Sequence, residues 1–222
     1  MNAGWMVFLS IVFSTLEIVM ILSLSLLLFR ISFRKKLDQI VLIGVILSYI
    51  SFKMREFGLT GWDTLLQIIL MILALRMIFS IGWIYSVIIV AAGALALYSG
   101  IQFVVYWLIT RSQGVQFLTQ DGLSSGALLL QGGTVIIGFI LAFLMNRFHW
   151  GVTFVPYDPK EPVELIGINK RIFIAAVCII GAFMLSLIAI HFRIDTLIEI
   201  SGLTLLILLV YILRLVFKKE FL

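Results

Sequence analysis

Glu17 is the residue of this 222-residue chain whose position most clearly suggests chemistry. It is an acid inside an apolar run from about Trp5 to Phe29, and it lies about 18 Å along the predicted helix from Trp5. An ionised carboxylate at that depth of a bilayer is expensive, so Glu17 should be protonated, paired or facing a cavity. Two interpretations remain open: a site for a ligand, ion or proton, or a protonated carboxyl that is hydrogen-bonded to a neighbouring helix.

Other polar residues could share a site with Glu17. Ser10, Ser14 and Ser25 fall within about 80 degrees of it around a helix, so this face should point into the protein. Later segments carry polar residues near their predicted outer ends: Gln67, Tyr98, Gln102, Tyr106, Gln131, Thr134 and Glu199. The predicted ligand-binding set in an outward-opening pocket is Glu17, Ser14, Tyr98, Gln102, Tyr106, Gln131 and Glu199. The alternative is a set of helix-to-helix hydrogen bonds without a ligand.

The composition indicates what positions these residues. Hydrophobic residues make up 63% of the chain and charged residues 12%, which is far from a soluble domain. Unbroken apolar runs of about 20 residues favour membrane helices over barrel strands. The predicted fold class is all-α, a polytopic transmembrane helical bundle. The net charge of +5 fits basic loops on the cytoplasmic side better than nucleic-acid binding.

About seven spans are predicted in a single membrane domain, at residues 5–29, 37–52, 64–79, 83–109, 127–145, 172–190 and 196–217. The turn Gly58–Asp63 should face outward, and residues 146–171 should form a cytoplasmic loop. With the N-terminus outside and the C-terminus inside, only four of the 16 basic residues lie outside: Lys53, Arg55, Arg111 and Arg193. We therefore expect a multi-pass protein of the plasma membrane.

Two patterns suggest contacts with other proteins. Pro156, Pro159 and Pro162 recur every three residues in the loop, as in polyproline II, so they form either a partner-binding surface or a stiff connector. Small residues recur every four positions in two spans, at Ala92, Ala96 and Gly100 and at Gly138 and Ala142. Such ladders favour close helix packing, and a partner interface stays open.

The sequence offers little for catalysis. His149 and His191 should lie on opposite sides of the membrane, so they cannot share a metal. Cys178 has no base at helical spacing within its own span, which argues against a nucleophile. Arg76 should lie near the cytoplasmic end of its helix and extend toward the headgroups. We expect no enzyme activity, no metal and no cofactor.

Three stretches carry a resemblance to a known family: LFRISFRKKLDQIVLIGVILSYISFKMRE, GVTFVPYD and ELIGINKRIF. In these the chain resembles the membrane input region of the AgrC-like sensor histidine kinases of Firmicutes and their short relatives without a kinase. The resemblance implies a helical bundle that receives a secreted peptide or another extracellular cue. It departs from the kinases after Lys219, where only three residues remain. Either a separate partner receives the signal, or the chain is the membrane region of a longer kinase.

The predicted function is a non-catalytic membrane sensor or receptor-like protein that binds an extracellular or lipid-borne cue. Its predicted partners are the lipid bilayer, a cytoplasmic or membrane signalling protein, and further copies of itself. The alternative is a small-solute-binding transport subunit, similar to the S components of energy-coupling factor transporters. Those usually have six helices, and an odd number of spans argues against them.

Overall fold

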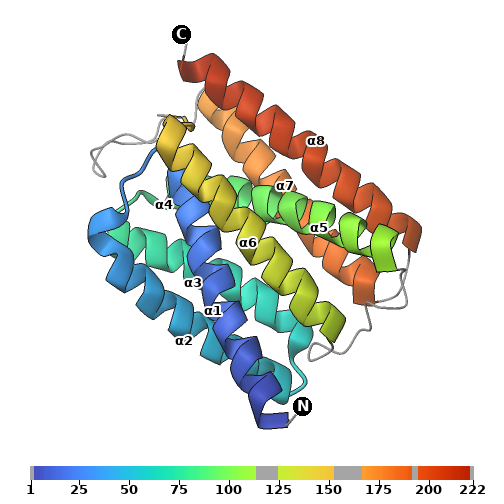
Figure 1. Ribbon diagram of the computed structural model, residues 1–222. Coiled ribbons are helices and arrows are strands. Elements are labelled where there is room, and N and C mark those ends of the chain that lie inside the picture. Colours follow the sequence, from blue (N-terminus) through green and yellow to red (C-terminus); the bar gives the residue numbers. More distant parts are fainter. Residues whose placement is uncertain (1–2, 114–124, 153–166, 192–194, 221–222) are drawn as a thin grey trace.

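The structure is a computed structural model that describes residues 3–113, 125–152, 167–191 and 195–220. The described part of the chain is a bundle of long helices without strands (Figure 1). Seven of its segments are long and apolar enough to cross a membrane. The all-α class and the number of spans are therefore confirmed.

The helices follow one another with short connections. Their bounds are α1 Ala3–Leu28, η1 Arg34–Lys36, α2 Leu37–Glu56, α3 Thr60–Phe79, α4 Trp83–Ile89, η2 Val90–Leu97, α5 Tyr98–Gln113, α6 Ser125–Phe148, α7 Ile168–His191 and α8 Asp195–Glu220. The short η1 is a 3-10 helix and η2 is a π-helix. Since α4, η2 and α5 follow without a break, they form the fourth span together.

Several predicted helix ends were too early or too late. The helix expected at 37–52 continues to Glu56, and the one expected at 64–79 begins at Thr60, so the predicted turn Gly58–Asp63 is wrong beyond Leu59. The expected loop 146–171 is shorter, because α6 continues to Phe148 and α7 begins at Ile168. Charged and amide side chains such as Lys, Arg, Glu and Gln favour helix, so helices continue past their apolar runs into the headgroup region.

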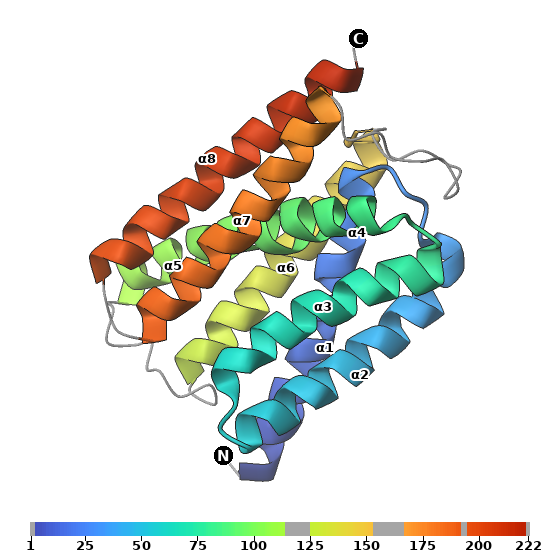
Figure 2. The same ribbon diagram turned by 180° about the vertical axis from the view of Figure 1, so that it is seen from behind.

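The fourth span crosses the bundle obliquely between two groups of helices (Figure 2). Its η2 section packs against α1 and α3 as well as α7 and α8. Every residue from Val90 to Ala96 is buried. Small side chains there allow neighbouring backbones to approach closely, as helix packing in membranes requires. The core of the protein is therefore centred on η2.

The two ends of the chain lie at opposite ends of the bundle (Figure 1). We call these ends the N-terminus side and the C-terminus side. Basic residues collect on the C-terminus side, in η1 and in the last turns of three helices, at Arg76, Arg147, Lys218 and Lys219. Large apolar side chains are exposed along the outer faces of the helices, as expected for surfaces that contact lipid.

Both small-residue ladders are used inside the bundle. Ala92 and Ala96 are buried in η2, and Ala142 is buried in α6. A Cβ added at Gly138 would lie 2.7 Å from Cγ of Met20 in α1. The packing interpretation of the ladders is thus confirmed at these residues.

Candidate functional site: a carboxylate shared by three spans

Glu17 lies near the middle of α1 and is hydrogen-bonded from two other spans. The hydroxyl of Tyr98, the first residue of α5, donates to Oε1 of Glu17. The side-chain amide of Gln131 in α6 donates to Oε2 over 2.7 Å and to Oγ of Ser14 over 3.2 Å. We call Ser14, Glu17, Tyr98 and Gln131 the Glu17 cluster. It joins α1, α5 and α6 by side chains alone.

Close helix contacts hold these side chains together. On one flank, Gly138 gives Met20 of α1 room to pack against α6. On the other flank α1 crosses η2, where a Cβ added at Gly93 would lie 2.6 Å from both Cα and Cβ of Ser25. Because α1 is fixed between η2 and α6, the carboxyl group can accept one hydrogen bond from Tyr98, which directly follows η2, and one from Gln131 in α6.

The electrostatic setting of the cluster is unusual for a membrane interior. Both oxygens of Glu17 accept a hydrogen bond, yet its hydrogen-bond partners within the described part of the chain, Tyr98 and Gln131, are neutral. Ser14 is buried, whereas Glu17 keeps partial exposure. Such a carboxyl group can accept hydrogen bonds from a ligand or bind a cationic group, and it also ties the three helices together.

Four members of the predicted ligand-binding set thus lie together, and the others do not join them. Gln102 is half-buried, and Tyr106 is 41% exposed. A spacing of four residues drifts about 40 degrees around a helix per step, so the face that begins at Tyr98 turns outward along α5. Glu199 lies in α8, with its side chain outside the described residues, as are Pro156, Pro159 and Pro162.

A second polar cluster joins α2 to α3, and the sequence analysis identifies only one of its members, Gln67. Oγ of Ser51 in α2 donates to Oδ2 of Asp63 over 2.6 Å, and Nε2 of Gln67 donates to Oδ1 over 3.2 Å. Asp63 is buried, with 9% of its surface exposed. The sequence analysis predicts Asp63 at the end of the turn Gly58–Asp63, whereas it lies in the first turn of α3. The available signal was an acid three residues after Thr60, a spacing that is typical of a first helical turn.

Other candidates have structural roles or lie apart. Arg76 donates to the carbonyl oxygen of Ile81 over 3.2 Å at the end of α3, which fits its predicted place at a helix end. The backbone places His149 on the C-terminus side and His191 on the N-terminus side. Cys178 is exposed. Within the described residues, no group of three His, Cys, Asp or Glu side chains could hold a metal.

Comparison with known proteins does not extend this site. No protein-family model, curated protein or solved structure matches the chain. The function must therefore be inferred from the geometry of the Glu17 cluster and its surroundings.

Proposed function

We propose that this protein is a non-catalytic integral membrane sensor whose Glu17 cluster binds a cue. The observation that supports it best is the Glu17 carboxyl group, held at mid-membrane by neutral donors from two further spans. Acids inside the membrane are rare because they are expensive, and they usually mark a site of function. A ligand that replaced one of these donors would change how α1, α5 and α6 pack.

The distribution of basic residues supports a direction for the proposed signalling. The C-terminus side carries the basic helix ends and would face the cytoplasm under the positive-inside rule. The cue would then come from outside or from the lipid, and the output would pass through helix packing to a separate partner. The loop with Pro156, Pro159 and Pro162 remains our candidate for partner binding.

The transport-subunit alternative needs a surface on which a larger membrane partner docks. The small-residue ladders were the candidates for that surface. Ala92 and Ala96 are instead buried in the centre of this bundle, and Gly138 is covered by Met20. This packing leaves those ladders unavailable to a partner and supports a sensor over a transport subunit.

Native mass spectrometry of the protein extracted gently from its own membrane tests the proposal. The variants are Glu17→Gln, which keeps the shape but removes the charge, and Tyr98→Phe, which removes one donor. The control is Ser86→Ala, a buried serine of the fourth span outside the cluster. We expect a small molecule or peptide that is retained by the wild type and the control and is lost from both cluster variants.

Two outcomes would contradict ligand binding by the Glu17 cluster. If all four proteins retain the same bound species, or the wild type retains none, the Glu17 cluster is a helix-to-helix hydrogen-bond network without a ligand. A co-purifying membrane partner linked to an ATPase would instead favour transport.

A further inference from the structure

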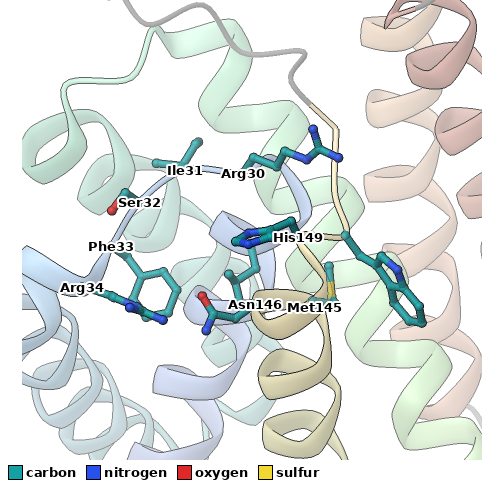
Figure 3. A pocket seen from close by; sticks show the side chains of 10 residues that line it. Arg30, Ile31, Ser32, Phe33, Arg34, Met145, Asn146 and His149 are labelled. Atoms are coloured by element: carbon teal, nitrogen blue, oxygen red, sulfur yellow. The ribbon is translucent and has the colours of Figure 1, made fainter.

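A pocket of about 330 Å³ lies at the C-terminus side, between the chain that leaves α1 and the chain that leaves α6 (Figure 3). The residues that matter for its chemistry are Arg30, Phe33, Arg34, Asn146, His149 and Trp150. It is separate from the Glu17 cluster, since Glu17 precedes the end of α1 by 11 residues, about 16 Å of helix.

Backbone contacts give this pocket fixed walls. Arg30 and His149 both adopt positive φ, 50° and 54°, so each chain reverses directly after its helix. The amide of Val152 donates to the carbonyl oxygen of Leu28 over 2.8 Å, which joins the two reversals. Gly151 lies between them with φ 144°, and a Cβ there would lie 2.5 Å from the carbonyl oxygen of Leu27. The pocket is therefore built by two hydrogen-bonded chain segments.

Five of the ten residues that line the pocket are apolar or aromatic, and the polar ones are cationic or can donate hydrogen bonds. Arg30 and Arg34 come from the α1 side, whereas Asn146 and His149 come from the end of α6 (Figure 3). Among the residues that the structure describes, none that lines the pocket is acidic. A basic residue at a helix carboxyl end is ordinary, because it offsets the helix dipole. Arg34 is different, since it precedes the amino end of α2, where the dipole already adds positive potential.

The residues next to the pocket indicate its depth in the membrane, and the depth indicates which anions it would meet. Trp150 is exposed, and its ring stacks on Phe148 with 5.5 Å between centroids. Exposed tryptophans at the ends of membrane helices usually lie at the level of the lipid headgroups. Basic pockets between helices at that level bind phosphate-bearing headgroups. A volume near the lower end for ligand sites suits one headgroup or one small phosphate ester.

From this arrangement we propose that the pocket binds a phosphate group, supplied by the headgroup of an anionic phospholipid. Arg30 and Arg34 would pair with the phosphate oxygens, and Asn146 and His149 would donate hydrogen bonds from the other wall. Trp150 would keep the pocket at headgroup depth. The same chemistry would accept a soluble phosphate ester, so the test needs an arm for each source.

The first arm uses the purified full chain in nanodiscs that contain phosphatidylglycerol and phosphatidylcholine, with native mass spectrometry of the retained lipid. The second arm titrates glycerol phosphate into the protein in a neutral maltoside detergent. The variants are Arg34→Gln and the pair Arg30→Asn with Arg34→Gln, because Asn tolerates the positive φ at position 30. The control pair, Arg55→Gln with Arg111→Gln, removes the same charge from the N-terminus side.

We expect affinity for phosphatidylglycerol to fall roughly 5-fold in the single variant and roughly 30-fold in the double variant. The control pair should bind like the wild type. The same losses for glycerol phosphate, without a preference for phosphatidylglycerol, would keep the phosphate site and assign it a soluble ligand. Equal losses in the pocket and control pairs, or no loss in either arm, would overturn the proposal. Circular dichroism and the single variant separate lost binding from lost folding.

Discussion

Replacing Gly93 by alanine should destabilise the bundle strongly, because this position is where α1 crosses η2. The new Cβ would lie 2.6 Å from Cα and from Cβ of Ser25. Favourable carbon–carbon contacts need about 3.5–4.0 Å, so the helices must separate by about 1 Å. The Cα of Ser25 is part of the α1 backbone, and Ser25 is 1% exposed. Ala92 and Ala94, on either side of Gly93, are also buried. Neither α1 nor η2 can therefore make room by moving a side chain alone.

The expected loss for Gly93→Ala is about 2–3 kcal/mol in the free energy of unfolding, since overpacking of a tight core typically costs about 1–3 kcal/mol. Gly202→Ala in α8 is the matched control, because a Cβ there meets nothing within 4 Å. Alanine favours helix over glycine by about 1 kcal/mol, so the control should gain slightly. Unfolding by dodecyl sulfate in mixed micelles, followed by circular dichroism, measures both. Equal midpoints for the two variants would refute the described crossing of α1 and η2.

Two further substitutions test buried polar groups by the same measurement. Asp63→Ala should lower the free energy of unfolding by about 1–3 kcal/mol, because it leaves the hydroxyl of Ser51 without its acceptor; an unchanged midpoint would show that α2 and α3 are not joined there. Ser86→Ala should keep or raise stability by about 1 kcal/mol, because its buried hydroxyl has no hydrogen-bond partner in the described structure. A marked loss would reveal a bond to Ser86.

Much of the bundle is predictable because lipid imposes simple rules. Apolar runs long enough to cross a bilayer must be helical, which determines the seven spans. Ser14 and Glu17 lie on the inner face of α1 because the helical period places them with Ser10 and Ser25, and all three serines are buried. An acid in such a place needs donors, and Tyr98 and Gln131 in later spans supply them.

Other features depend on contacts that a linear pattern does not contain. The segment Val90–Leu97 is rich in small apolar residues, which predicts close packing but not a π-helix. Its crossing with α1 depends on which helices meet in three dimensions. The basic pocket was missed for a related reason. Arg30 and His149 are far apart in the chain, and the bond from Val152 to Leu28 brings their segments together.

The helices α1 and α6 connect the two proposed sites. Near the middle of the bundle they share the bonds from Gln131 to Ser14 and Glu17, and their carboxyl ends lead into the two walls of the basic pocket. Between these points Met20 packs against Gly138, with no space for even a Cβ. Close-packed contacts move as units, so a cue that shifted α6 against α1 at Glu17 would also change the spacing of the pocket walls. A phosphate bound there would oppose that shift, and under the proposed function the lipid would therefore set how readily the protein responds to its cue.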